Sequence, residues 1–254
     1  MTFAPYVAKD RFFRDFHFDF HIVNETGQSW YDGSPSQWMP EREWCVSKLM
    51  KGMTVVDCGA HHGMLSLIFA SAVGPTGKVF SYEALPSNAA VVELNASLNG
   101  LENIEVRAVG VGDVQGSVTV SFNASNTVVM TSDLSKDQAD EVIQIVRLDD
   151  DLAPFVKVDF LKIDVEGHDL NALRGMPRIL SHRPIIDLEL HNFIFADKVS
   201  TLGQILSILQ PLGYSWELLT EIGEEPVKIG RCLELQKLLQ FANPHLFGVP
   251  GLRK

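Results

Sequence analysis

The segment Asp57–Gly63 places a carboxylate and two glycines at the end of an apolar run that begins at Met53. A glycine at such a turn lets the backbone approach a ligand closely, and a second one lets the following helix pack on the sheet. The carboxylate of Asp57 suits a cationic group. This spacing is typical of a cofactor-binding turn between a strand and a helix, and its candidate contacts are Asp57, Gly59, Ala60, His61 and Gly63.

The next apolar run, Lys78–Tyr82, leads into Glu83, which stands 24 residues after Gly59. A carboxylate at the end of a second strand accepts hydrogen bonds from both hydroxyls of an adenosine ribose, and it repels a 2′-phosphate. The remaining predicted cofactor contacts are Ala84, Gly110 and Asp164, which also follow apolar runs.

Two classes of cofactor use this layout. A dinucleotide carries a pyrophosphate, which binds bare backbone N–H groups at a helix N-terminus and is repelled by a carboxylate. S-adenosylmethionine carries an amino-acid end instead, so Asp57 suits its ammonium and the helix N-terminus near His62 suits its carboxylate. Because the Gly-x-Gly-x-x-Gly spacing is also absent, we expect S-adenosylmethionine, with S-adenosylhomocysteine as the product. The simpler alternative is a turn that needs glycines for packing alone.

Two later apolar runs end in ionisable side chains. The period of two places Lys162, Asp164 and Glu166 on one side of the first run, and Asp187, Glu189 and His191 on one side of the second. If the two strands are neighbours, these ends meet. We predict His191 as the general base, because its ordinary pKa near 6.5 suits proton transfer at neutral pH. Asp164 and Glu189 are the predicted partners that orient its imidazole.

Other interpretations of these charges stay open. Lys162 is expected to neutralise Asp187 or Glu189 as a structural ion pair, since buried charges need partners. Asp164, Glu189 and His191 could together hold a divalent cation, but we expect a metal-free route. The pattern His17-x-Asp19-x-His21 is expected to be a solvated strand face, because its side chains lie about 7 Å apart per step.

These residues need a parallel sheet to position them. Alternating apolar strands and helices predict an α/β fold with a mostly parallel sheet and helices on both of its faces. We expect an inserted β-hairpin at Gly116–Asn123 and Glu141–Leu148, and antiparallel closing strands at Tyr214–Thr220 and His245–Val249. The other expected strands are Met53–Asp57, Lys78–Glu83, Ile104–Val109, Val158–Asp164 and Pro184–Glu189, and the helices are His62–Ala72, Pro86–Leu98, Leu170–Ser181 and Leu202–Gln210.

The first 44 residues hold 11 of the 23 aromatic residues. Asp15–Ile22 alternates as a strand, Asn24–Pro35 is expected to be a loop, and Glu41–Met50 a helix ending at Gly52. We therefore divide the chain into residues 1–52, an aromatic extension with the first helix, and residues 53–254, the cofactor-binding domain. Such an extension is suited to fold over the open edge of the sheet as a lid on the substrate.

Composition limits the partners. The chain has 254 residues, 46% of them hydrophobic, and a formal charge of −11 with no basic run, which disfavours nucleic acid. No apolar run is long enough to span a membrane, and no secretory signal precedes residue 10. The three separated cysteines fit reduced thiols. We expect a cytoplasmic protein with a small-molecule substrate, and homodimer formation stays open.

Several motifs resemble the FkbM family of class I methyltransferases. They are Val56–Gly63, Tyr82–Ser87, Arg147–Asp150, Leu161–Gly167, Leu173–Gly175, Pro184–Leu190 and Leu246–Pro250, with Lys-Ile-Asp-Val-Glu-Gly the most specific. The resemblance spans Met53 to Pro250. It implies a Rossmann-like class I methyltransferase fold with a mostly parallel seven-stranded sheet. It also implies methyl transfer from S-adenosylmethionine, usually to an oxygen of a sugar or secondary metabolite. His61-His62 and Ala84 depart from the family's more usual residues.

The sequence therefore predicts a methyltransferase that methylates a hydroxyl group. Three alternatives remain: N-methylation of a small molecule or peptide by the same fold, a nicotinamide-dependent oxidoreductase, and a non-catalytic module that keeps the cofactor fold. The oxidoreductase is disfavoured by Asp57 and by the glycine spacing. The non-catalytic module is disfavoured by the acidic and histidine side chains at the strand ends, which it would not need.

Overall fold

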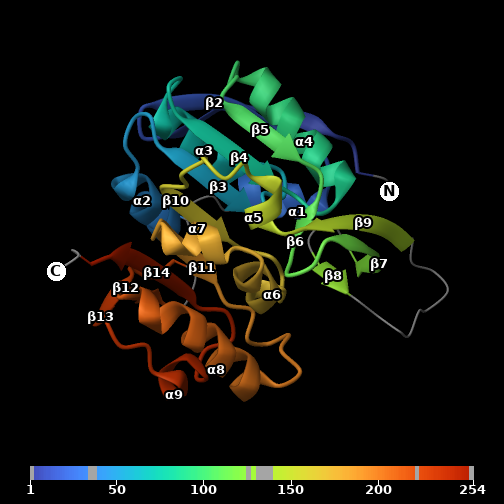
Figure 1. Cartoon of the computed structure of the whole chain (residues 1–254). Coiled ribbons are helices and arrows are strands. Elements are labelled where there is room, and N and C mark those ends of the chain that lie inside the picture. The colour runs from blue at the N-terminus through green and yellow to red at the C-terminus, as the bar shows by residue number, and fades with distance from the viewer. Residues whose placement is uncertain (1–2, 34–38, 124–126, 130–139, 221–222, 252–254) are drawn as a thin grey trace.

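The computed structural model describes residues 3–33, 39–123, 127–129, 140–220 and 223–251. Within these ranges the strands form a central sheet of eight, a second sheet of four and a two-stranded hairpin (Figure 1). The central sheet lies in the middle of the molecule and the other two lie at its sides.

The central sheet has the order β13-β12-β14-β11-β10-β3-β4-β5. From β5 the chain returns to the other side of β3, so the strand order reverses between β3 and β10, where open α/β sheets bind ligands. The strands are β3 (Thr54–Cys58), β4 (Lys78–Tyr82), β5 (Ile104–Arg107), β10 (Phe160–Ile163), β11 (Ile185–Glu189), β12 (Tyr214–Leu219), β13 (Val227–Gly230) and β14 (His245–Pro250).

The predicted mostly parallel sheet is confirmed, with two corrections. β14 lies between β11 and β12 and is antiparallel to both, so β12 runs parallel to β11 instead of being a second antiparallel closing strand. An eighth strand, β13, pairs with the outer edge of β12. The sequence did not indicate β13 because this short edge strand is mostly exposed, with Val227 62% exposed, and so lacks an apolar alternation.

Helices cover both faces of the central sheet because consecutive strand residues face opposite sides. Val55 packs with Phe69 and Phe160 on the face that carries α2 and α3, and Val56 packs with Leu173 and Ile205 on the other. None of the helices in the described ranges combines the length and apolar character needed to cross a membrane. The longer helices are α2 (Met39–Lys48), α3 (Met64–Val73), α4 (Pro86–Leu98) and α8 (Lys198–Leu209).

The helix predicted over Leu170–Ser181 is two helices, α6 (Asp169–Arg174) and α7 (Pro177–Ser181). Gly175 caps the first, and only glycine fits there because a Cβ would lie 1.9 Å from the carbonyl oxygen of Gly112. Pro177 then begins the second, where its missing N–H costs nothing. The remaining short helices are α5 (Leu148–Asp151), α9 (Leu235–Leu238) and the 3₁₀ turn η3 (Gln210–Leu212).

The predicted hairpin insertion is confirmed, since β7 and β9 pair antiparallel. It forms a sheet of its own with the order β6-β9-β7-β8 and does not join the central sheet. Its strands are β6 (Gly110–Val111), β7 (Gly116–Asn123), β8 (Thr127–Val129) and β9 (Asp140–Val146).

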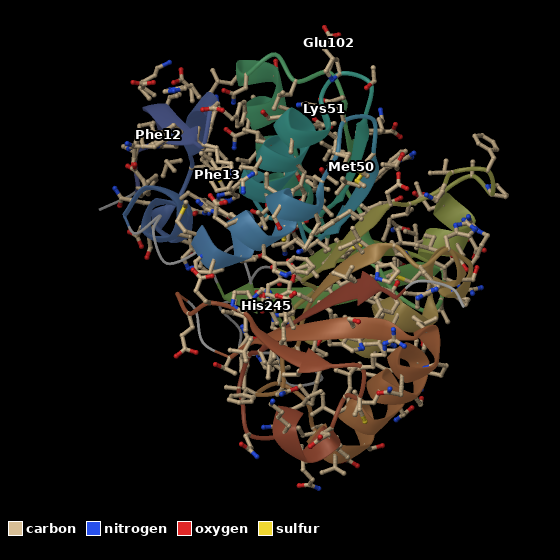
Figure 2. All side chains as sticks on the ribbon, turned by 90° about the vertical axis from the view of Figure 1, so that its left-hand side faces the viewer. Phe12, Phe13, Met50, Lys51, Glu102 and His245 are labelled. Carbon is tan, nitrogen blue, oxygen red and sulfur yellow. The ribbon has the colours of Figure 1, made fainter. Side chains whose placement is uncertain are left out.

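The aromatic N-terminal segment forms a hairpin of β1 (Tyr6–Phe13) and β2 (Phe16–Ile22). Phe20 and Ile22 pack against Leu67 and Ile68 of α3. Figure 2 shows Phe12 and Phe13 of this hairpin at the side of the molecule, away from His245 in the central sheet. The hairpin is therefore an outer layer on the helices.

The loop predicted over Asn24–Pro35 is wrong as far as residue 33, because α1 (Glu25–Gly27) and the π-helical turn η1 (Gln28–Gly33) occupy it. Asn24 starts this helical segment by accepting a hydrogen bond from the Gly27 backbone N–H with its side chain. The last two residues of the predicted loop lie outside the described residues.

Candidate active site

A cavity of about 690 Å³ opens at the carboxyl ends of β3, β4, β10 and β11. It lies at the reversal of strand order, as expected for an open α/β sheet. The four-stranded sheet contributes Val118, Ile143 and Ile145 to one wall, and the N-terminal segment contributes Trp30 and Tyr31. Among the described residues, none from the hairpin β1–β2 lines it, so the predicted lid is limited to these two aromatic side chains and the start of α2.

The structure brings nearly all predicted site residues to this cavity. The exception is Gly63, where an added Cβ would lie 2.9 Å from Cγ1 of Val92 in α4. Gly63 thus lets α3 pack on α4, where packing on the sheet was expected. The predicted residues that line the cavity are Asp57, Gly59, Ala60, His61, Glu83, Ala84, Gly110, Asp164, Glu189 and His191.

The turn after β3 is held by its own amide groups. Gly59 and Ala60 donate their backbone N–H groups to the carbonyl oxygen of Tyr82, over 2.8 and 3.0 Å. His61 donates its backbone N–H to Glu83 Oε2 over 2.7 Å. Gly59 has φ +85°, and a Cβ there would lie 1.7 Å from the Asp164 carbonyl oxygen, so the glycine is required by the neighbouring strand. Few amides of this turn are left for a pyrophosphate.

The carboxylate of Glu83 accepts more hydrogen bonds from the protein itself than its predicted role as a ribose ligand implies. Its carboxylate accepts from the backbone N–H groups of His61 and Leu85 and from the Asn88 side chain. Burial raises the pKa of Glu83 to about 7, although these three hydrogen bonds oppose the rise. Three of about four acceptor sites are thus occupied, which leaves room for one ribose hydroxyl where two were expected.

Asp57 keeps a free acceptor at the cavity wall. Its side chain is 1% exposed and its Oδ2 accepts a 2.6 Å hydrogen bond from the Ser66 hydroxyl. Its Oδ1 has no hydrogen-bond partner among the described residues. A buried carboxylate oxygen without a donor is costly, and burial raises the pKa of Asp57. A ligand that brings an N–H donor satisfies it.

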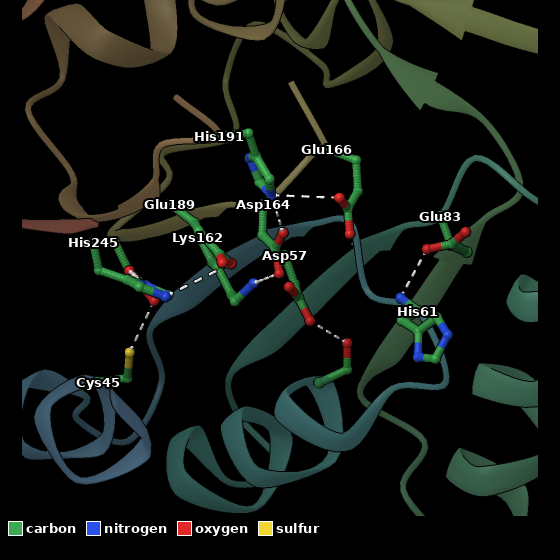
Figure 3. A network of polar contacts seen from close by, with 12 residues as sticks. Cys45, Asp57, His61, Glu83, Lys162, Asp164, Glu166, Glu189, His191 and His245 are labelled. Carbon is green, nitrogen blue, oxygen red and sulfur yellow. Dashed lines mark hydrogen bonds and ion pairs between the residues drawn. The ribbon is translucent and has the colours of Figure 1, made fainter. Parts of the chain in front are cut away.

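A carboxylate–histidine cluster lies at the ends of β10 and β11, which are neighbours as predicted (Figure 3). His191 Nε2 lies 3.6 Å from both Asp164 Oδ1 and Glu166 Oε2. Its Nδ1 lies 3.2 Å from the buried Asp169. Lys162 Nζ binds the other oxygen of Asp164 over 2.8 Å, so the predicted ion pair of Lys162 with Asp187 or Glu189 is wrong. Lys162 and Asp164 stand two residues apart and therefore face the same side of β10.

These neighbours change the protonation of His191. Burial alone would lower its pKa, but the hydrogen bond to Asp169 and the charges of Asp169, Glu189 and Asp164 outweigh burial and raise the pKa to about 9. The ordinary pKa expected from the sequence is therefore wrong. Burial and the Asp164 charge raise the pKa of Glu166 to about 7, so its carboxylate exchanges a proton near neutrality.

Glu189 does not orient the imidazole of His191. Its Oε1 accepts a hydrogen bond from the Asn243 side chain, and its Oε2 lies 3.7 Å from His245 Nε2. Asp169 takes the predicted orienting role. Sequence reasoning missed Asp169 because it begins α6 and does not lie on a strand.

Two other wall residues were not predicted to take part. Tyr31 Oη lies 2.6 Å from His61 Nδ1, which ties the N-terminal segment to the cofactor-type turn. Arg42, in the first turns of α2, lines the cavity and is 6% exposed. Neither Tyr31 in η1 nor Arg42 in α2 stands in a sequence motif that pointed to it.

Two groups of side chains in the described ranges have the spacing to hold a metal ion. Asp164, Glu166 and His191 form the first and face the cavity. Glu41, Asp187 and His245 form the second, which is buried. In the second group His245 Nδ1 is already 3.1 Å from Asp187 Oδ1, so that group is a closed ion pair.

The strand order, the antiparallel β14 between β11 and β12, and the cavity at the reversal of strand order define a class I methyltransferase fold. Residues 57–216 match the family described as the methyltransferase FkbM domain. The chain belongs to the FkbM methyltransferase family.

The chain is similar at low sequence identity to several known methyltransferases. It is 25% identical to Methyltransferase 1 of Beauveria bassiana (strain ARSEF 2860) over 144 residues, which are 48% of this chain and 57% of that protein. The crystal structure of FkbM methyltransferase from Methylobacillus flagellatus KT gives a TM-score of 0.49 at 19% identity, and the match covers 78% of this chain and 44% of that one. An O-methyltransferase from Bacillus cereus in complex with SAH gives 0.49 at 14% identity, covering 86% and 83%. The chain thus spans little more than half of the curated relative that it matches.

Proposed function

We propose that this protein transfers a methyl group from S-adenosylmethionine to a hydroxyl group of a small molecule, such as a sugar or a secondary metabolite. The observation that carries the proposal is that one cavity holds both the turn at Asp57–His61 and the cluster of Asp164, Glu166 and His191. Membership of the FkbM methyltransferase family supports it. The cavity volume lies within the roughly 300–1,000 Å³ of small-molecule sites.

The cavity residues fit the cofactor. The unpaired Oδ1 of Asp57 suits the ammonium of the methionine end, and the remaining acceptor site of Glu83 suits a ribose hydroxyl. Ala84 and Leu85 supply an apolar wall beside them. When bound, S-adenosylmethionine supplies an electrophilic methyl group.

The cluster at the strand ends handles the acceptor's proton. A hydroxyl becomes acidic as its oxygen bonds to carbon, so the base has to be within reach only late in the step. His191 and Glu166 share the cavity wall, and their pKa values of about 9 and about 7 lie on either side of the physiological range. The aromatic side chains of Trp30, Tyr31 and Phe193 line the same cavity and supply apolar surface for an acceptor.

The geometry of the same three residues supports a second route. Asp164, Glu166 and His191 offer two carboxylates and an imidazole, and Asp169 holds the far nitrogen of His191 as carboxylates do behind metal-bound histidines. A divalent cation held there would lower the pKa of an acceptor hydroxyl.

Specific observations weigh against the alternatives. The amides of Gly59, Ala60 and His61 are occupied within the chain, which disfavours a pyrophosphate and so a nicotinamide cofactor. A neutral amine needs less assistance than a hydroxyl, so the cluster favours O-methylation over N-methylation. In a non-catalytic module these buried charges would lower the stability of the fold without serving a reaction.

The proposal is tested with methyl-labelled S-adenosylmethionine and a panel of hydroxylated and amino-substituted sugars and metabolites. We expect label transfer to a hydroxyl oxygen, located by mass spectrometry and accompanied by an equal amount of S-adenosylhomocysteine. Label found on nitrogen would move the assignment to N-methylation. Binding of NAD in place of the methyl donor would overturn the proposal.

A further inference from the structure

Arg42 is a buried cation whose guanidinium makes no hydrogen bond or contact ion pair with the described residues, although the nearby Glu41 and Tyr31 influence its charge. Its side chain is 6% exposed and faces the cavity. Within those ranges no ion pair or hydrogen bond reaches its guanidinium. By contrast, Arg178 binds the carbonyl oxygens of Asp149 and Leu152. The adjacent Glu41 attracts the guanidinium only through its charge, because its carboxylate lies in the group formed with Asp187 and His245.

A buried guanidinium without a partner is costly, and burial lowers the pKa of Arg42. A ligand with an anionic group removes that cost. Guanidinium binds planar carboxylates in a bidentate manner, which makes arginine a better match for a carboxylate than lysine. The cavity therefore contains a preformed carboxylate site at Arg42.

The position of Arg42 indicates which carboxylate it binds. Glu83 stands at the end of β4 and Asp57 at the end of the adjacent β3, so a cofactor with its ribose at Glu83 and its ammonium at Asp57 extends from β4 toward β10. α2 packs on the same face as α3. Arg42, in the early turns of α2, lines the same cavity as Met64 and Leu65, the first residues of α3. It also lies within electrostatic reach of Tyr31, whose hydroxyl is 2.6 Å from His61 Nδ1 in the turn after β3.

We propose that Arg42 binds the carboxylate of the methionine moiety of S-adenosylmethionine, an inference that rests on the proposed function. The N-terminus of α3, to which the sequence assigned this carboxylate, adds its partial positive charge beside Arg42. The amino acid of the cofactor is then held from two sides, by Asp57 at the ammonium and by Arg42 at the carboxylate.

Calorimetry with two ligands tests the proposal, because 5′-methylthioadenosine lacks the amino-acid end that S-adenosylhomocysteine carries. In Arg42→Met the Kd for S-adenosylhomocysteine should rise by at least about tenfold, and the Kd for 5′-methylthioadenosine should stay within twofold of wild type. Arg42→Lys should lose less affinity. Arg14→Met removes an arginine that is exposed and paired with Glu43, and it should change neither Kd.

Unchanged S-adenosylhomocysteine affinity in Arg42→Met would overturn the inference and leave the proposed function standing, with Arg42 free for a carboxylate of the acceptor. An equal loss for both ligands would overturn it as well, because Arg42 would then shape the adenosine site. If the wild-type protein binds neither ligand, the proposed function fails first and this inference fails with it.

Thermal unfolding separates a ligand-binding role from a structural one. Without ligand, Arg42→Met should unfold at or above the wild-type temperature, because the substitution removes an unpaired buried charge. The rise in unfolding temperature on adding S-adenosylhomocysteine should be smaller than in wild type. A marked loss of stability in the ligand-free variant would assign Arg42 to the fold and contradict the proposal.

Discussion

The imidazole of His191 lies between three carboxylates, and these neighbours set its protonation state. Asp164 and Glu166 both face Nε2 (Figure 3). Asp169 lies 3.2 Å from Nδ1 and fixes the ring from the other side. With a pKa of about 9 the imidazole is mostly protonated at pH 7. Proton transfer at neutral pH is then a property of the whole cluster and not of the imidazole alone.

Replacing His191 tests the role of this cluster. We expect His191→Gln to lower turnover by roughly 100-fold, the usual contribution of a general acid or base, and to leave S-adenosylhomocysteine affinity within twofold. Turnover is measured under saturating cofactor and affinity by calorimetry. His17→Gln, an exposed histidine on the N-terminal hairpin, is the matched control and should behave as wild type.

Chelation separates the two routes through the same cluster. Wild-type turnover should persist after EDTA treatment if the side chains alone take the proton. Loss of activity in EDTA with recovery in magnesium would instead assign Asp164, Glu166 and His191 to a cation. Wild-type turnover in His191→Gln would remove the cluster from the reaction altogether.

The sequence pointed to the residues at the strand ends because strand period and glycine spacing are local properties. It placed Asp57, Glu83, Asp164 and His191 on one cavity correctly. It could not show that the Glu83 carboxylate is largely occupied by hydrogen bonds from the turn after β3. Nor could it show that Glu189 faces His245, because these partners come from distant segments of the chain. Arg42 carried no motif, and only its burial without a partner marks it.

At the scale of elements, the N-terminal hairpin is an extension of the core around α3. The side chains of Asn95 in α4 and of Asn99, which caps its C-terminus, accept hydrogen bonds from the backbone N–H groups of His21 and Asp19. The ring of Phe20 lies 5.1 Å from that of Tyr31, which in turn reaches His61. The hairpin thus supports the aromatic cavity wall from behind.

Two phenylalanines of this hairpin give a matched pair. Phe20 is 1% exposed and Phe12 is 71% exposed. Phe20→Ala should lower the free energy of unfolding by about 3–5 kcal/mol, because it empties space between β2 and α3. Phe12→Ala should change it by less than about 0.5 kcal/mol. Urea unfolding followed by circular dichroism measures both, and equal stabilities would contradict the packing described for the hairpin.

The elements that the sequence predicted well are those with one clear apolar pattern. α4 begins and ends at the predicted residues, Pro86 and Leu98.

β1 was missed because Lys9, Asp10 and Arg11 interrupt its apolar residues, and it is stabilised by pairing with β2. The break at Gly175 was a visible signal, but its cause is the distant backbone of Gly112.

At the scale of the whole molecule, charges inside the central sheet connect the cavity to α2. Cys45 in α2 donates its thiol to Asp187 on β11, and His245 Nδ1 on β14 lies 3.1 Å from the same carboxylate. His245 Nε2 faces Glu189 (Figure 3). These groups are buried, so water screens them little. The stability of the molecule therefore depends on their protonation.

His245 sets the direction of that dependence on pH. Burial alone would lower its pKa, but the charge of Glu189 and the hydrogen bond to Asp187, together with the charges of Asp187 and Glu41, raise the pKa to about 10. Its ordinary value in the unfolded chain is about 6.5. Between these values only the folded state holds the proton, so stability is full below pH 6.5 and is lost as the pH rises through 10.

Urea unfolding at pH 6.5, 8 and 9.5 measures this loss. Each pH unit within the window is equivalent to about 1.4 kcal/mol for one group, so wild type should lose about 2 kcal/mol or more across it. Glu189 acts in the same direction up to its pKa of about 8, which burial raises. His245→Gln removes the proton that stabilises the fold and should lose less than half as much over the same range. His182→Gln, an exposed histidine after α7, should follow wild type, and equal slopes in His245→Gln and wild type would show that other groups control alkaline stability.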